Sequence, residues 1–131
     1  MKNSAEIVKW EPLPDIPSKM FLEGLIDDYE GFRLLLKGDR ITSGVLKIEF
    51  RTRIGYRNMD ETYRLKSLNK YPILTSPWSL FKIKNDEFVI WVCDESNGIL
   101  DDSNLLTNYI FCTPNDIVEV ISKEEPVVYW L

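Results

Sequence analysis

Alternation of apolar and polar residues, interrupted at short intervals by turn-forming residues, constrains the fold of this chain most strongly. In the clearest case, Leu46, Ile48 and Phe50 alternate with Lys47 and Glu49. A period of two places successive side chains on opposite faces of a β-strand. The segment therefore predicts a strand with one buried face, which needs neighbouring strands to complete a sheet.

Other segments rich in β-branched and aromatic residues follow one another through short turns. Strands joined in this way pair antiparallel. We therefore expect an α+β fold, a mainly antiparallel sheet with one or two helices packed on it. The predicted strands are residues 20–26 and 32–36 around a turn at 27–31, residues 78–83, residues 105–112 and 117–121 around a turn at 113–116, and an edge strand at 126–131.

Two segments are candidates for the helices. Residues 59–68 predict a short helix capped by Asn58, although an Arg-rich loop fits the same residues equally well. Residues 86–96 favour a helix, because Asn85 can cap its start and the Asn-Gly pair that follows can end it. The β-branched residues within this segment are also typical of a buried strand, so the sequence leaves helix and strand open.

The length of 131 residues predicts a single globular domain over residues 1–131. A chain of this size buries roughly two thirds of the surface that its unfolded form exposes, which supports a core without disulfide or metal cross-links. Three prolines between residues 12 and 17 disfavour both helix and central strand. Residues 1–18 are therefore expected to form an extended lead-in.

Cysteine usage and the absence of a targeting pattern predict a cytoplasmic protein. Cys93 and Cys112 each lie inside an apolar run, which is typical of buried, reduced thiols. A disulfide framework in a small secreted chain uses more cysteines. The first ten residues lack the apolar stretch of a signal peptide, and no apolar run reaches the length of a membrane span. We therefore expect no membrane partner.

The chain contains no histidine, which excludes the usual Ser-His-Asp and Cys-His nucleophilic sites and removes the commonest metal ligand. It also lacks a cysteine pair at zinc-finger spacing and a Gly-rich phosphate loop. The acid pairs 27–28 and 101–102 are candidates for a carboxylate hydrolase, but both lie in predicted turns, where Asp is favoured for backbone reasons. We expect a protein that is not an enzyme and has no catalytic residues, metal or cofactor.

The formal net charge of −5 is unevenly distributed. Residues 71–131 contain three lysines and ten acids, whereas most cations lie in residues 37–70. A stretch of Arg and Tyr in the basic part could clamp a small ligand or stack with single-stranded nucleic acid, although the overall acidity disfavours nucleic acid. The residues of this alternative ligand site are Arg51, Arg53, Tyr56, Arg57 and Arg64.

Four phrases of the sequence together resemble a group of known proteins. They are Trp10-Glu11-Pro12 leading to Asp15-Ile16-Pro17, the run 28–34 (Asp-Tyr-Glu-Gly-Phe-Arg-Leu), the run 56–61 (Tyr-Arg-Asn-Met-Asp-Glu), and the run 113–120 (Thr-Pro-Asn-Asp-Ile-Val-Glu-Val). The chain resembles small bacterial proteins, some of which lie beside polymorphic toxin systems as candidate immunity proteins. The resemblance extends from about residue 10 to the end, but the apolar run around Trp91 departs from the more polar helix of that pattern.

The resemblance implies a non-enzymatic protein that neutralises a bacterial toxin by direct binding. Many cytotoxic domains are basic nucleases, so an acidic surface would speed association with such a partner. The sequence does not specify the partner or the oligomeric state. The expected contacts are acids with nearby aromatic residues on two turns: Asp27, Asp28, Tyr29 and Glu30 on one, and Asp94, Glu95, Asp101 and Asp102 on the other.

Overall fold

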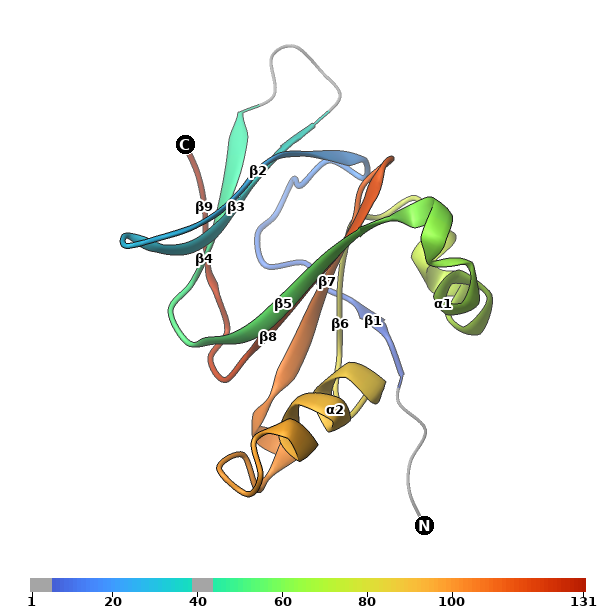
Figure 1. Cartoon of the computed structure of the whole chain (residues 1–131). Helices are drawn as coiled ribbons and strands as arrows, with labels where there is room; N and C mark the ends of the chain where they lie inside the picture. Colours follow the sequence, from blue (N-terminus) through green and yellow to red (C-terminus); the bar gives the residue numbers. More distant parts are fainter. Residues whose placement is uncertain (1–5, 39–43) are drawn as a thin grey trace.

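Two antiparallel sheets form the framework of the protein (Figure 1). The computed structural model describes residues 6–38 and 44–131, so the first five residues of the predicted lead-in lie outside it. One sheet has the strand order β1-β6-β7-β8-β5 and the other β2-β3-β4-β9. The strands are β1 (Val8–Lys9), β2 (Met20–Asp28), β3 (Gly31–Gly38), β4 (Val45–Phe50), β5 (Arg53–Asp60), β6 (Leu80–Ile83), β7 (Thr107–Cys112), β8 (Asp116–Ser122) and β9 (Val127–Trp130).

Two α-helices and three 3₁₀ turns complete the part of the chain that the structure describes. The predicted α+β class is confirmed, although the strands divide between two sheets. In the described ranges, no helix combines the length and the apolar character that crossing a bilayer requires. The helical elements are η1 (Glu61–Tyr63), α1 (Leu65–Lys70), η2 (Pro72–Thr75), α2 (Glu87–Glu95) and η3 (Ser103–Leu105).

The alternating pattern builds the four-stranded sheet as predicted. In the β3–β4 ladder, Leu34 lies opposite Ile48 and Leu36 lies opposite Leu46. All four side chains are fully buried, whereas Lys47 on the other face of β4 is half-buried. The C-terminal strand β9 pairs with β4 at the edge of this sheet, as the sequence predicted.

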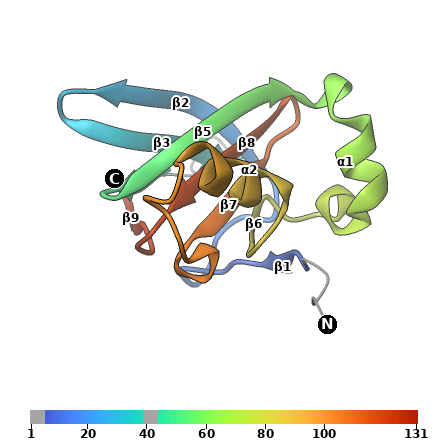
Figure 2. The same cartoon turned by 60° about the horizontal axis from the view of Figure 1, so that its bottom comes forward.

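Strands β7 and β8, in the middle of the larger sheet, are buried on both faces. Tyr109 and Phe111 join the core cluster that lies between the two sheets. The alternate residue Ile110 and its neighbour Ile117 belong to a second cluster, beneath α1 and η2. A third cluster places Ile121 under α2. Figures 1 and 2 show α1 and α2 beside different parts of this sheet.

The N-terminal segment is attached to the larger sheet. Strand β1 pairs with β6, and the backbone N–H of Trp10 donates to the Leu80 carbonyl at 2.9 Å. Ile7 and Trp10 are buried, and the Trp10 ring centre lies 4.9 Å from that of Tyr109. The segment before β2 therefore contributes a large aromatic side chain to the core between the sheets.

The helix predicted over residues 59–68 is wrong at its start and right in its later part. Strand β5 continues to Asp60, and Asn58, the predicted cap, lies opposite Val118 of β8. A 3₁₀ turn over Glu61–Tyr63 and the helix α1 over Leu65–Lys70 then follow. Pairing with β8 satisfies the backbone of the polar residues up to Asp60, so tertiary pairing overrides their local preference for a helix or loop.

Residues 87–95 form the helix that the sequence could not separate from a strand. Its cap is Asp86, whose Oδ1 accepts the Val89 N–H at 3.0 Å, and not the predicted Asn85, which has a φ of 56°. The β-branched residues suit this helix because one side of it packs on Leu106 and Ile121.

Cys93 and Cys112 are free thiols, as expected, but each is half-buried and not fully enclosed. Burial raises the pKa of Cys93 and raises that of Cys112 to about 12. Both side chains therefore stay protonated at neutral pH and are weak nucleophiles.

Replacing Trp10 by alanine is expected to lower the free energy of unfolding by about 4 kcal/mol, because it removes a fully packed aromatic side chain. The matched change Trp91→Ala affects a ring that is 58% exposed, and we expect a loss within about 1 kcal/mol. Urea unfolding of the two variants measures both values. Equal losses would show that the N-terminal segment adds little to the core.

Candidate functional site

The first predicted contact region lies at the β2–β3 hairpin. The sequence predicted Asp27 and Asp28 in the turn, but in the structure they end strand β2. Asp28 accepts two hydrogen bonds from Arg33, at 2.8 and 3.3 Å, and Asp27 accepts one from Arg53 at 3.1 Å. The Arg33 hydrogen bond lowers the pKa of Asp28. The charges of Asp27 and Asp28 are thus paired within the chain. Two exposed residues complete its tip, Tyr29 and Glu30.

The second predicted region lies on α2 and the loop after it. Its four acids are exposed, and none of them pairs with a cation in the part of the chain that the structure describes. The sequence contains no Lys or Arg between Lys84 and Lys123, so the region has no cation of its own. We call these acids, with the exposed apolar residues nearby, the α2 surface: Ile90, Trp91, Asp94, Glu95, Ile99, Asp101, Asp102 and Leu105.

Apolar side chains are exposed among the acids of the α2 surface. Trp91 is 58% exposed and Ile90 is 43% exposed. Ile90, Asp94 and Asp101 line one shallow depression, which shows that the helix and its following loop form a continuous surface. The sequence did not single out Trp91 as a contact residue, because it lies in an apolar run. Helical spacing places it one turn after Glu87, on the exposed side.

The structure separates the residues of the Arg/Tyr stretch. Arg51 is exposed before β5, and the Arg53 guanidinium lies 5.5 Å from the ring centre of Phe32 and 5.9 Å from that of Tyr56. Two other members, Arg57 and Arg64, instead line a cavity on the other side of the sheet. The predicted single clamp is therefore not present as one surface.

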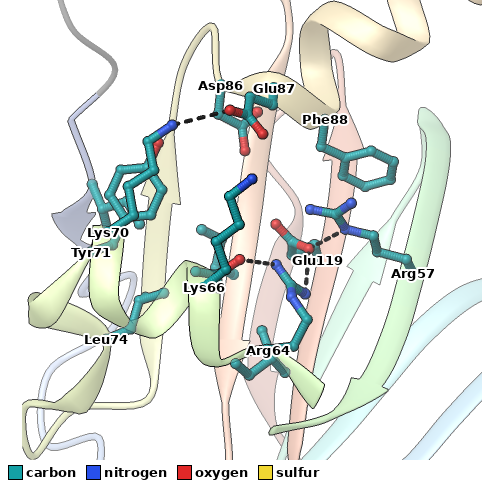
Figure 3. Close-up of a pocket in the computed structure, with 14 residues that line it drawn as sticks. Arg57, Arg64, Lys66, Lys70, Tyr71, Leu74, Asp86, Glu87, Phe88 and Glu119 are labelled. Carbon is teal, nitrogen blue, oxygen red and sulfur yellow. Dashed lines mark hydrogen bonds and ion pairs between the residues drawn. The ribbon is translucent and has the colours of Figure 1, made fainter. Parts of the chain in front are cut away.

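This cavity of about 100 Å³ lies between α1, the start of α2 and the larger sheet (Figure 3). Its apolar lining comes from the cluster beneath α1, including Leu74, Ile110 and Ile117. Its charged lining comprises four cations and three carboxylates: Arg57, Arg64, Lys66, Lys70, Asp86, Glu87 and Glu119.

The buried carboxylate of Glu119 organises the cavity. Arg57, its direct partner in the β5–β8 ladder, donates from Nε to Oε2, and Arg64 Nη1 donates to the same oxygen at 2.9 Å. Asn108 Nδ2 donates to Oε1 at 3.1 Å. Burial by itself raises the pKa of Glu119, but the hydrogen bond and charge of Arg57, with those of Arg64, outweigh burial and hold it below its usual value.

Asn108 connects Glu119 to a second buried acid. Its Nδ2 also donates to Asp86 Oδ2 at 3.0 Å. Burial raises the pKa of Asp86, although the hydrogen bonds from Asn108 and the Val89 backbone oppose that rise. The opposite orientation of the Asn108 amide would place its oxygen against the carboxylates of Asp86 and Glu119. Its Oδ1 therefore faces away from them, and this oxygen has no hydrogen-bond partner among the described residues.

Aromatic contacts connect the cavity wall to the α2 surface. The guanidinium of Arg57 lies 4.2 Å from the ring centre of Phe88, which favours a cation–π interaction. Phe88 in turn stacks on Trp91, with ring centres 6.4 Å apart. Phe88 therefore contacts a charged group of the cavity on one side and the exposed indole on the other.

Sequence reasoning missed Glu119. It alternates with Val118 and Val120, which made it the expected solvent-facing residue of a half-buried strand. The helices cover that face of β8, so Glu119 is only 3% exposed. The only signal for its environment was the presence of Arg57 and Arg64 in a polar segment 62 and 55 residues earlier in the chain.

Across residues 6–38 and 44–131, no three His, Cys, Asp or Glu side chains group together as metal ligands would. Comparisons with protein-family models, curated proteins and solved structures found no match to this chain. Its function is therefore inferred from the geometry of the cavity and the α2 surface.

Replacing Glu119 by glutamine is expected to lower the free energy of unfolding at neutral pH by about 3 kcal/mol, because Arg64 would remain buried without its counter-charge. Glu87→Gln is the matched control: it breaks the exposed Lys70–Glu87 ion pair at 3.2 Å and should change stability little. Urea unfolding compares the two. Similar small effects would mean that Glu119 is not needed to hold the two arginines.

The contribution of Glu119 should also depend on pH. Its pKa in the folded protein lies below the ordinary value of 4.5, so its stabilisation is complete above that value and is lost as pH falls through the folded pKa. The difference in unfolding free energy between wild type and Glu119→Gln should therefore shrink in acid. Unfolding at a series of pH values from neutral downward measures it, and a constant difference would contradict the shift.

Proposed function

We propose that this chain is a non-enzymatic, cytoplasmic binding protein that neutralises a bacterial toxin by direct contact. The observation that carries the proposal is the α2 surface, which combines an exposed Trp91 with four acids that have no cation partner among the described residues. The resemblance to candidate immunity proteins supports the same function. The two free thiols agree with a reducing compartment.

The α2 surface has the composition of a protein interface. Tryptophan is among the residues that most often dominate binding energy, and it does so where surrounding contacts exclude water from it. The flanking acids favour a partner with a basic surface, because complementary charge speeds association and disfavours wrong partners. The β2–β3 hairpin fits this role less well, since Asp27 and Asp28 are already neutralised by Arg53 and Arg33.

A carboxylate-dependent hydrolase fits the geometry less well. Asp86 and Glu119 do approach one cavity, but each of their oxygens already accepts a hydrogen bond. A general acid or nucleophile needs an oxygen available to the substrate. The cavity of about 100 Å³ is also small beside the clefts of about 300 Å³ or more that usually hold substrates.

Nucleic-acid binding through the Arg/Tyr stretch is likewise disfavoured. Arg53, Arg57 and Arg64 each pair with an acid of the chain itself. Their charges are therefore largely compensated before any phosphate approaches. The part of the stretch that still favours a small ligand is the pair of arginines in the cavity.

The experiment that tests the proposed function is a rescue assay with the products of the genes that flank this one. Each product is expressed in a bacterial host with and without this chain. We expect one product to be toxic, wild type to restore growth, and Trp91→Ala to lose at least about tenfold in affinity for it, as for a hot-spot residue. Tyr29→Ala, which removes a 95% exposed aromatic residue from the other acidic region, is the matched control and should still rescue.

Association of the purified pair should slow as salt rises, because screening weakens attraction between exposed charges. The charge reversal Asp94→Lys should slow it further at low salt. Stopped-flow or surface-plasmon measurements follow both effects. The proposal fails if no flanking product is toxic and bound, or if the Trp91 and Tyr29 variants rescue equally.

A further inference from the structure

Hydrogen-bond donors without an assigned acceptor gather in the cavity beside Glu119. Lys66 extends from α1 toward the carboxylates of Asp86 and Glu119 (Figure 3), yet no carboxylate in the described ranges lies within ion-pair distance of its amine. Arg57 uses only Nε on Glu119, which leaves its two Nη groups for another acceptor. Lys70 makes one bond, to the exposed Glu87 at 3.2 Å.

The buried acceptors of the cavity, by contrast, are already occupied, and among its carboxylates only the exposed Glu87 keeps an oxygen without a hydrogen bond from the described residues. Both oxygens of Glu119 and both oxygens of Asp86 receive hydrogen bonds from the protein. A ligand that donates hydrogen bonds would have to compete for these oxygens, whereas a ligand that accepts them would meet unused N–H groups. The unbalanced hydrogen-bonding capacity therefore favours an acceptor, and the excess of cations over carboxylates favours an anion.

We propose that this cavity is a binding site for a small oxyanion, the chemistry that a phosphate and a carboxylate share, with Lys66 as its principal contact. The volume of about 100 Å³ has room for several water molecules, which is the scale of such a group and not of a nucleotide or sugar. The side chain of Lys66 supplies a mobile point charge, and Arg57 supplies fixed N–H donors.

Glu119 prepares the site without contacting the ligand. Its carboxylate holds the guanidinium groups of Arg57 and Arg64 beside the cavity, so their positions are set before an anion arrives. Glu119 is a positioning residue in this arrangement. The proposal is separate from toxin neutralisation, because Lys66 does not belong to the α2 surface.

The test is an NMR titration of the ¹⁵N-labelled full chain with sodium phosphate and, in a second arm, with sodium acetate, each at an ionic strength held constant with NaCl. We expect saturable shifts of amides around the cavity, in particular those of Asp86, Glu87 and Glu119. Lys66→Gln should weaken binding by about tenfold, the loss of one charge-assisted hydrogen bond. Lys123→Gln removes the same charge from an exposed residue outside the cavity lining and should leave binding unchanged.

Saturation by phosphate alone would assign the site to phosphate groups, and saturation by acetate alone or by both would assign it to carboxylates or to oxyanions in general. Shifts that do not saturate in either arm would overturn the proposal. Equal weakening by Lys66→Gln and Lys123→Gln would overturn it too, since that result describes non-specific attraction. Well-dispersed spectra of both variants show that a lost response is not a loss of folding.

Discussion

The burial of β7 and β8 on both faces is the constraint on which the rest of the structure depends. One face needs the four-stranded sheet, because Phe111 and Val120 must be covered by apolar residues of β3 and β4. The other face needs helices, because Ile110 and Ile121 would otherwise meet water. The three layers follow from this requirement, and so do the positions of the candidate sites. The cavity is formed where helices meet the larger sheet, and the α2 surface is the side of α2 that is not packed on it.

The face of β8 that the helices cover carries the acid Glu119, and the need to replace its lost hydration determines the polar network around it. A carboxylate on a buried face is tolerated only when hydrogen bonds and opposite charges replace water. Glu119 therefore has Arg57, Arg64 and Asn108 around it, and Asn108 extends the network to the cap of α2 at Asp86. These polar groups occupy the space between α1 and α2, where an apolar core would have closed the cavity.

Charge is separated in space between the two candidate sites. The cavity concentrates four cations, two of which are held by the buried Glu119, whereas the α2 surface carries acids without cation partners in the described part of the chain. An acidic, partly apolar surface suits a basic protein, and a cavity rich in donors suits a small anion. Phe88 lies between the two sites, in contact with Arg57 and Trp91. Trp91 fluorescence thus offers a way to detect whether occupancy of one site affects the other.

The sequence by itself determined the strands other than β1 and β5, the two hairpins and the acidic character of the α2 surface. Period-two alternation and turn residues act over a few neighbouring positions, so they can be interpreted without knowledge of the fold. Tertiary structure decided that residues 53–60 form a strand, because β8 offers them a partner, and that Glu119 is buried, because helices cover β8. It also decided that Asp27 is neutralised, since its partner Arg53 is 26 residues away, and that Arg57 reaches Glu119 across 62 residues. Local patterns cannot report such contacts, because they arise only when distant segments pack together.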